Sequence, residues 1–481
     1  MHNLKKNFGY QMIYRILTVI TPLITSPYLA RTLRVESLGR YSASYAFAGY
    51  FVLFSLLGIE NYGNRTIAKY QDDKFMRSET FWNIYIIQFV MSCCSIFTYV
   101  IFVNSFITPG LRGIYLLQIL CLVDALLNIN WFFWGCEQFK ITVTRNIVIK
   151  ILSVISILLF VKGPSDLWIY ILIMGLSVVL AEGALWFFLP RYVTQPRVHW
   201  SDVQKNIKPV AHLFVPVLAL SVFHLMDKTM LNMLSDDANS GYYYNSDKLI
   251  NIPLQLITGM SAVMLPRIAN TLHKDGQSRV MELLRKSSEL TLFLTCAVAF
   301  GIGAISEKFV PFFFGSGYEP CVVLIRVFVP VLIIKALSDF IRTQYLIPVG
   351  RDKLYTIAVF GGAVSNLIVN YALIIRFGAL GAVIGTLVAE FVVLLIQAIG
   401  AKRELSLLKI VGSNYVYILF GLIMFVIVSL LSTCIHSTGV GAICILILVG
   451  AIVYLSCCVI YWRKNAQSIF NKYVVQGKYN G

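Results

Sequence analysis

Long apolar stretches alternate with short polar segments along the whole chain. Each stretch holds about 20 residues, which is the length an α-helix needs to cross the hydrocarbon core of a bilayer. The pattern therefore predicts an all-α integral membrane protein with about 14 transmembrane helices. The predicted spans are residues 9–33, 40–63, 80–104, 113–135, 140–162, 166–189, 208–234, 241–266, 288–314, 321–348, 353–376, 378–400, 412–434 and 440–462.

The composition supports a membrane protein and argues against a soluble enzyme. Hydrophobic residues make up 58% of the 481 residues and charged residues only 13%, whereas soluble domains carry about 25% charged residues. The ten cysteines lack the spacing of a zinc site or a disulfide framework, so we expect no metal and no cofactor. The first apolar run follows Lys5 and Lys6 without a small-residue cleavage site, which predicts a retained first span.

The basic residues predict the orientation in the membrane. About two thirds of the 40 Lys and Arg residues lie in or beside the segments that share a side with the N-terminus. The positive-inside rule places that side in the cytoplasm, and an even number of spans places both termini there. The net charge of +17 is then explained by topology and by attraction to anionic lipids, and no nucleic-acid partner is expected.

An internal repeat is indicated by two matching segments. Gly39 and Arg65 in the first half have the same spacing as Gly241 and Arg267 in the second half. Repeats of six spans enter the membrane from the same side, as parallel repeats do. We therefore expect two six-helix bundles and two further helices. The predicted segments are an N-terminal bundle at 1–207, a C-terminal bundle at 208–410, and the last two spans with a cytoplasmic tail at 411–481.

Charged residues inside the spans are the candidates for function. A charge in hydrocarbon costs roughly 2.5–3.5 kcal/mol on insertion scales, so such residues usually face water, a partner or a ligand. The pairs Asp227–Lys228 and Asp247–Lys248 both lie ~9 Å from the outer ends of their helices. Neighbouring residues on a helix do not face each other, so each Lys could bind an anion and pair with an Asp of the other helix. The predicted substrate-binding residues are Arg15, Arg31, Asp227, Lys228, Asp247 and Lys248.

A second group of charges is predicted to act in coupling or gating. The alternative for all these charges is that they tie helices together or reach the membrane surface. Asp339, for example, is spaced to pair with residues three and four positions away on its own helix. His224 could carry a proton or simply lie at the interface. The candidates for coupling or gating are Glu60, His224, Lys335, Asp339 and Arg342.

Several stretches resemble the bacterial Wzx-type and teichoic-acid-type flippases of the multidrug/oligosaccharidyl-lipid/polysaccharide superfamily. In the first half these are "PLITSPYLARTLRVESLGRYSASYAF" and "GIENYGNRTIA". In the second half they are "FVPVLALSVFHLMDKTML", "GYYYNSDKLINIPLQLITGMSAVMLPRIAN" and "YLIPVGRDK". One departure is the turn "LRVESLG", where the family usually has "LGAEGIG" and this chain has Arg34 in place of the first glycine.

The resemblance implies a MATE-like fold with a cleft that opens to one side at a time. It implies transport of an undecaprenyl-diphosphate-linked oligosaccharide across the bacterial cytoplasmic membrane, by a monomer, in contact with membrane lipids and polysaccharide assembly machinery. Tyr242, Tyr243 and Tyr244 could stack on sugar rings or form an interfacial belt. Coupling to H+, to Na+ or to the membrane potential stays open.

Other functions are weighed against this one. A peptidoglycan-precursor flippase has nearly the same chemistry, while a cation or drug antiporter of the same superfamily would need a more acidic cleft. A membrane-bound polymerase or glycosyltransferase would need a sizeable catalytic loop, which the short loops do not provide, so we expect a transporter and no enzyme. A scaffold would not need charged spans.

Overall fold

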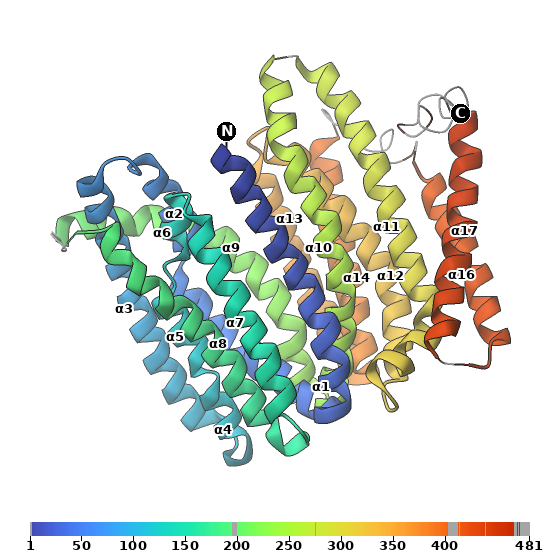
Figure 1. Ribbon diagram of the computed structural model, residues 1–481, viewed down its shortest axis with the longest axis horizontal. Coiled ribbons are helices and arrows are strands. Elements are labelled where there is room, and N and C mark those ends of the chain that lie inside the picture. Colours follow the sequence, from blue (N-terminus) through green and yellow to red (C-terminus); the bar gives the residue numbers. More distant parts are fainter. Residues whose placement is uncertain are drawn as a thin grey trace. The chain divides into compact units, whose positions relative to one another are not determined.

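The computed structural model consists of helices joined by short connections within the residues that it describes (Figure 1). It describes residues 2–194, 200–274, 276–402, 414–437 and 439–465, together with residues 412, 469 and 471. Within these residues there is no strand. The helices are α1 (His2–Leu56), α2 (Ile59–Lys69), α3 (Lys74–Phe106), α4 (Pro109–Leu117), α5 (Ile119–Leu127), α6 (Asn130–Gly135), α7 (Phe139–Phe160), η1 (Pro164–Asp166), α8 (Leu167–Phe188), η2 (Leu189–Arg191), α9 (Trp200–Leu234), α10 (Asp237–Lys274), α11 (Gly276–Phe314), α12 (Pro320–Ile341), η3 (Arg342–Leu346), α13 (Asp352–Phe377), α14 (Ala379–Ala401), α16 (Val416–Cys434) and α17 (Val440–Lys464).

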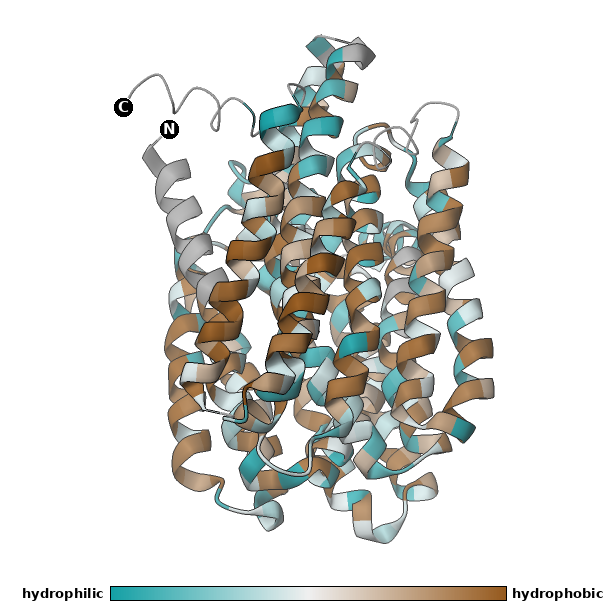
Figure 2. Ribbon diagram, turned by 90° about the vertical axis from the view of Figure 1, so that its right-hand side faces the viewer, coloured by the Kyte–Doolittle hydropathy of each residue, from teal (hydrophilic) through white to brown (hydrophobic). Residues whose placement is uncertain are grey.

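The predicted class of a multi-pass, all-α membrane protein is confirmed. Within the described chain, 12 helical stretches are long and apolar enough to cross a membrane. The first of them, Leu17–Lys69, contains two helical arms, and α9 (Trp200–Leu234) is a further helix of 35 residues. With the arms counted separately and α9 added, the helices correspond to the 14 predicted spans. Apolar residues follow the helices for most of their length (Figure 2).

The chain groups into two compact units, residues 1–233 and 234–481. The first unit holds α1 to α9 and the second holds α10 to α17. The sequence predicted three segments, with boundaries after residues 207 and 410. That division into two six-helix bundles and a last pair of helices remains a prediction.

Arg34 separates the first two spans. Its φ of 64° and ψ of 172° interrupt α1 at this residue. This backbone conformation is normally restricted to glycine, and other residues adopt it at a cost of about 1–3 kcal/mol. The break falls between the predicted spans 9–33 and 40–63. Arg34 also stands where the resembled family has glycine, so the departure in sequence places a strained residue in this turn.

Two spans predicted as continuous helices are interrupted. Between α1 and α2, Leu57 and Gly58 have positive φ angles of 46° and 78°. A Cβ added at Gly58 would lie 3.1 Å from the backbone of Leu213 in α9, so glycine allows this close approach. The fourth span consists of α4, α5 and α6, with breaks at Gln118 and Asn128. The sequence did not reveal these breaks because polar side chains from other helices satisfy the freed backbone groups.

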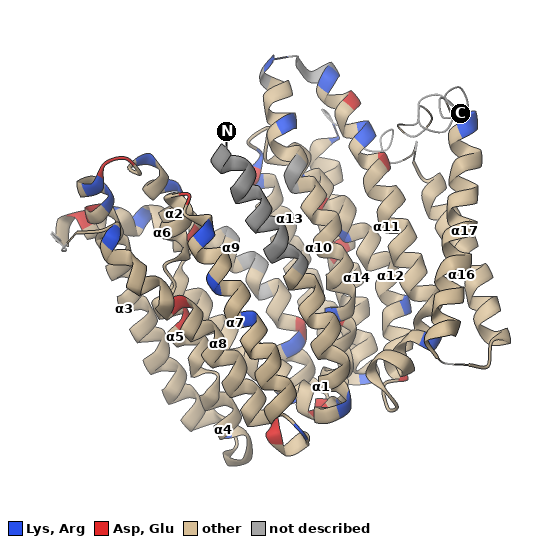
Figure 3. Ribbon diagram, viewed as in Figure 1, with Lys and Arg blue, Asp and Glu red and all other residues tan. Residues whose placement is uncertain are grey.

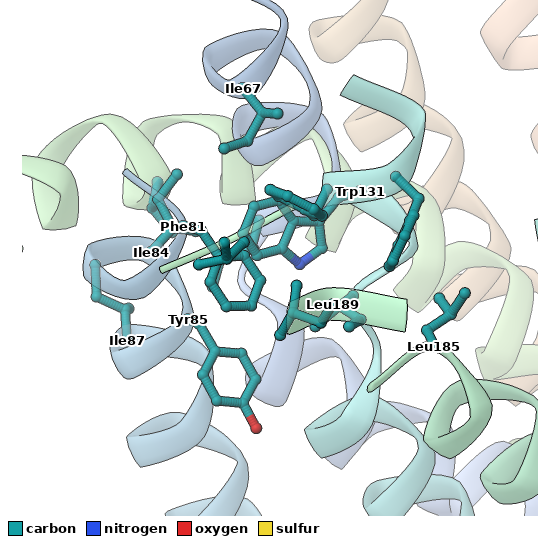
Figure 4. Close-up of a cluster of buried hydrophobic side chains, with 14 of the residues drawn as sticks. Ile67, Phe81, Ile84, Tyr85, Ile87, Trp131, Leu185 and Leu189 are labelled. Atoms are coloured by element: carbon teal, nitrogen blue, oxygen red, sulfur yellow. The ribbon is translucent and has the colours of Figure 1, made fainter. Parts of the chain in front are cut away.

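An aromatic cluster fixes the α2, α3 and α6 end of the first unit (Figure 4). Phe81 and Trp131 are fully buried, and their rings stack with centroids 5.5 Å apart. A Cβ added at Gly63 would lie 2.3 Å from the Trp131 ring. Glycine therefore lets α2 pack directly on the indole, and this rigid cluster supports the polar groups described below.

In the second unit, a buried carboxylate ties the last two helices to α11. Glu289 of α11 accepts a hydrogen bond from the Tyr417 hydroxyl at 2.8 Å and another from the backbone N–H of Ile469 at 3.0 Å. The Trp462 indole of α17 donates to the same Tyr417 hydroxyl at 2.8 Å. The last two spans are thus joined to α11 by a specific polar network.

Candidate functional site

A polar cluster surrounds the break between α5 and α6 in the first unit. The Gln88 amide of α3 donates to the carbonyl oxygens of Ala125 and Asn128 at 2.7 and 2.8 Å. The Trp186 indole of α8 donates to the Leu127 carbonyl at 3.0 Å. Backbone groups freed in a membrane helix must find partners within the protein. Side chains of α3 and α8 supply those partners and stabilise the interruption between α5 and α6.

The charged core of this cluster is the ion pair of Arg145 and Glu182. Arg145 of α7 lies 3.3 Å from Glu182 of α8, and their side chains are only 6% and 9% exposed. Asn130 donates to the Glu182 carboxylate at 2.6 Å and accepts from Arg145 at 3.1 Å. Arg145 also donates to the Ala181 carbonyl. The guanidinium thus binds three acceptors on the elements that surround it.

Glu60, a predicted coupling residue, belongs to the same cluster. Its carboxylate accepts a hydrogen bond from the Asn128 side chain at 2.9 Å. The sequence placed Glu182 and Glu60 inside spans but did not connect them, and it did not single out Arg145 or Asn130. The signals in the sequence were Arg145 itself, a charge within the predicted span 140–162, and the polar "NIN" sequence at 128–130 in an otherwise apolar span.

A partly open pocket of about 370 Å³ lies elsewhere in the first unit. It is lined by the second arm of α1, by α5, by α8 and by α9. His224 of α9 and Asp124 of α5 contribute to its lining, together with Tyr41, Tyr45 and Gln118. The structure therefore brings one predicted coupling residue, His224, to a cavity.

The predicted cations of the first unit lie in different environments. Arg31 is exposed in the first arm of α1. The backbone of Arg15 lies in α1, but its side chain is outside the described residues. On α9, Asp227 is 4% exposed and interacts with Tyr50 of α1, whereas Lys228 is half-buried. The two members of this Asp-Lys dipeptide thus differ in burial, as expected for neighbours on a helix.

The second Asp-Lys dipeptide lies on α10. The Asn251 amide, one turn along, donates to the Asp247 carboxylate at 2.7 Å. The Lys248 ammonium lies 5.5 Å from the centre of the Tyr244 ring, a cation–π contact. Both residues are half-buried. Their predicted role in binding substrate, and their predicted pairing with α9, remain predictions.

Tyr243, proposed from the sequence as a stacking residue, is used in packing. Its side chain is 3% exposed and its hydroxyl lies 3.2 Å from the Thr386 hydroxyl of α14. A buried ring cannot offer its face to a sugar without a rearrangement. Tyr244, beneath Lys248, is more accessible.

The predicted coupling residues on α12 and η3 form ion pairs within the second unit. Arg342 lies 2.5 Å from Asp339, three residues earlier, and 5.2 Å from the centre of the Tyr355 ring. Lys335 instead lies 3.5 Å from Glu390 of α14. Arg342 begins η3, a π-helical turn, and such turns are common at functional sites. The Asp339–Arg342 pair matches the spacing seen in the sequence, while the Lys335–Glu390 pair depends on helix packing.

Lys and Arg gather at several helix ends, most clearly on the hairpin of α10 and α11 (Figure 3). Its cations include Lys274, Arg279, Arg285 and Lys286. This agrees with a cytoplasmic position for the hairpin under the positive-inside rule, and the orientation itself remains a prediction.

The fold and these charged spans define a multi-pass membrane protein of the transporter type. Residues 4–272, more than half of the chain, match the family described as polysaccharide biosynthesis protein. The chain belongs to this family, and the resemblance found in the sequence is confirmed.

Curated relatives match over nearly their whole length. A putative O-antigen transporter of Escherichia coli (strain K12) is 23% identical over 413 residues, covering 81% of this chain and 95% of the relative. A putative O-antigen transporter of Shigella dysenteriae is 20% identical over 411 residues, covering 83% of this chain and 100% of the relative.

Solved structures share the fold at low sequence identity. The lipid II flippase MurJ in an inward closed conformation has a TM-score of 0.68 at 15% identity, covering 95% of this chain and 99% of that one. An inward-facing multidrug resistance MATE family transporter of the MOP superfamily has a TM-score of 0.59 at 12% identity, covering 81% and 99%. The predicted MATE-like fold is thereby confirmed.

Proposed function

We propose that this protein is a flippase that moves a lipid-linked glycan from the inner to the outer leaflet of the bacterial cytoplasmic membrane by alternating access. The observation that carries the proposal is the family match over residues 4–272. The alignment with putative O-antigen transporters over 95% and 100% of their lengths supports it. The cargo we propose is an undecaprenyl-diphosphate-linked oligosaccharide, such as a repeat unit of capsule, O-antigen, exopolysaccharide or teichoic acid.

The in-span cations explain how such a cargo could cross. A diphosphate carries negative charge that is very unfavourable in hydrocarbon, and it needs cations or hydrogen-bond donors throughout its passage. Arg15, Arg31, Lys228 and Lys248 are the cations that we propose to receive it, and Asp227 and Asp247 are proposed to hold Lys side chains when no cargo is bound. Lys and Arg suit this role because both bind phosphate oxygens strongly.

The remaining charges fit structural or coupling roles. Lys335, Asp339 and Arg342 form ion pairs within the second unit, and Glu60 accepts a hydrogen bond in the polar cluster of the first. These contacts favour a role in holding helices, and a coupling role during transport would require the pairs to exchange partners. The driving force we propose is a proton or sodium gradient or the membrane potential.

The proposal is tested in cells through the two lysines. Lys228→Ala and Lys248→Ala should each reduce cell-surface polysaccharide at least tenfold while the protein stays in the membrane at its normal level. Lys150→Ala is the matched control, because Lys150 is also an in-span lysine but lies at the middle of α7, a helix that carries none of the residues proposed to bind the diphosphate. Normal surface polymer in the Lys228→Ala/Lys248→Ala double variant would refute the proposed diphosphate site.

A peptidoglycan-precursor flippase is the second candidate function. The structural similarity to the lipid II flippase MurJ at a TM-score of 0.68 favours it, although the family match favours a polysaccharide cargo. Complementation separates the two: a polysaccharide flippase restores surface polymer to a cell that lacks its own, whereas a peptidoglycan-precursor flippase restores growth to a cell depleted of that activity.

A further inference from the structure

The pocket of the first unit is built from four helices that meet through small residues. Gly49 of α1 faces α9, and a Cβ added there would lie 3.0 Å from a Leu225 methyl group. Gly175 of α8 faces α5, and a Cβ there would lie 2.6 Å from the Leu120 side chain. Both glycines line the pocket. Gly49 lets α9 approach α1, and Gly175 lets α5 approach α8. The pocket is therefore bounded by closely packed helices.

One part of the pocket wall is aromatic. Tyr41 and Tyr45, one turn apart on α1, have ring centroids 5.8 Å apart, and both line the pocket. Tyr170 of α8 packs on Tyr41 with the ring centroids 4.8 Å apart. Tyr45 is 49% exposed, so part of its ring is free to touch a ligand. Aromatic rings of this kind provide large and rigid apolar contact surfaces.

The rest of the wall combines apolar side chains, among them Val52, Leu53 and Met174, with a few polar groups. Asp124 comes from α5 and Gln118 from the break before it, while Ser221 and His224 come from α9. Asp124 also acts electrostatically on the Tyr45 hydroxyl, so the carboxylate and the phenol lie at the same part of the pocket. Neither Lys nor Arg is among the residues that line it.

A lipid-linked glycan has three chemical parts, a hydrocarbon tail, a diphosphate and sugars, and the pocket does not suit them equally. A hydrocarbon tail would desolvate the Asp124 carboxylate without offering it a hydrogen-bond donor, which is costly. A diphosphate would meet the Asp124 carboxylate with no lining Lys or Arg to offset the repulsion. A sugar ring has hydroxyl groups that can donate to the Asp124 carboxylate, and it has C–H faces that pack on tyrosine rings.

We propose that this pocket binds a sugar ring of the cargo during transport. The inference rests on the proposed function and assigns one part of the cargo to one unit of the protein. The volume of about 370 Å³ is near the lower end of the range of about 300–1,000 Å³ for small-molecule sites, which suits one or two rings. The lysines proposed for the diphosphate lie outside the pocket lining, so the charged and the sugar parts have separate sites.

The test compares two lipids that differ only in their sugars. The full-length protein in lipid nanodiscs is titrated with undecaprenyl diphosphate, and with the lipid-linked oligosaccharide fraction extracted from cells that make the polymer. We expect the wild-type protein to bind the second lipid at least tenfold more tightly. Val178→Trp, which fills the pocket from α8, should reduce this preference to less than twofold and leave the affinity for undecaprenyl diphosphate unchanged.

A control and two conservative variants keep the test decisive. Leu180→Trp adds the same ring to α8 at a position that is 62% exposed and does not line the pocket, so it should behave as the wild type. Asp124→Asn and Tyr45→Phe change the chemistry of the pocket with little change in volume. Each should reduce the preference for the lipid-linked oligosaccharide over undecaprenyl diphosphate severalfold. These two variants replace Val178→Trp in the test if that variant does not reach the membrane.

The possible outcomes lead to different conclusions. A full tenfold preference in Val178→Trp, or in Asp124→Asn and Tyr45→Phe together, would overturn the assignment of the pocket. An equal loss of affinity for both lipids would overturn it too, because the pocket would then hold the tail or the diphosphate. A wild-type protein that binds neither lipid would instead remove the proposed function, and the pocket assignment with it.

Discussion

The polar cluster at the α5–α6 break and the pocket beside α5 place charges inside the same unit in two different ways. In the cluster, Arg145 and Glu182 are more than nine-tenths buried and contact each other and Asn130. In the pocket, Asp124 and His224 line a cavity of about 370 Å³. A buried charge that is paired within the protein holds helices together, whereas a charge that lines a cavity can also contact a ligand.

The largest expected effect comes from breaking the buried pair. Arg145→Met would leave the Glu182 carboxylate buried with the Asn130 amide as its hydrogen-bond donor but without its cation, and breaking such a pair typically costs about 3–5 kcal/mol. We expect a strong fall in the unfolding temperature of the purified protein and less protein in the membrane. Adding Glu182→Gln should recover most of the loss, since no uncompensated charge then remains.

An exposed ion pair provides the matched control for this experiment. Arg326 and Glu307 also lie close, at 3.0 Å, but their side chains are 36% and 46% exposed. Arg326→Met should therefore change the free energy of unfolding by less than about 1 kcal/mol. If Arg145→Met were no more destabilising than Arg326→Met, the view of the cluster as a structural tie would be wrong.

A smaller loss of stability is expected when the Lys335–Glu390 ion pair of the second unit is broken. Lys335 is 25% exposed while Glu390 is 6% exposed, so the pair is buried on one side only. Lys335→Met should cost about 1–3 kcal/mol, the range for hydrogen bonds to charged groups. Thermal unfolding measured alongside Arg145→Met gives the order of the two effects. A larger loss for Lys335→Met would contradict the ranking by burial.

The smallest change in stability is expected for Arg34, whose distinctive feature is its backbone conformation. Arg34→Gly should stabilise the protein by about 1 kcal/mol, because glycine adopts the φ of 64° without strain. Arg40→Gly is the control, since Arg40 lies in the helical second arm of α1 and glycine there should cost about 1 kcal/mol. Opposite shifts in unfolding temperature are expected, and a loss of stability in both variants would contradict the strain at Arg34.

The sequence predicted the fold class and the positions of most spans, because each span is an apolar run long enough to cross a bilayer. It also placed the break between the first two spans around Arg34. It did not predict the break at Asn128, since the groups that stabilise that break, Gln88 and Trp186, come from α3 and α8.

The site was harder to predict than the fold, for the same physical reason. Arg342 pairs with a residue on its own helix, which spacing alone reveals. Arg145 and Lys335 pair with residues on other helices, and such pairs are fixed by packing. The pocket depends likewise on how Gly49 and Gly175 let separate helices approach, and neither glycine stands out in the chain.

The most direct test of the central claim is transport by the purified protein in liposomes. A fluorescently labelled undecaprenyl-diphosphate-linked oligosaccharide is supplied, and the fraction that an impermeant reagent can reach is followed over time. We expect the wild-type protein to move the lipid between leaflets much faster than it moves in protein-free liposomes, and we expect no such acceleration with the Lys228→Ala/Lys248→Ala variant. Equal rates with the wild-type protein and with no protein, under an imposed proton gradient, sodium gradient or membrane potential, would contradict it.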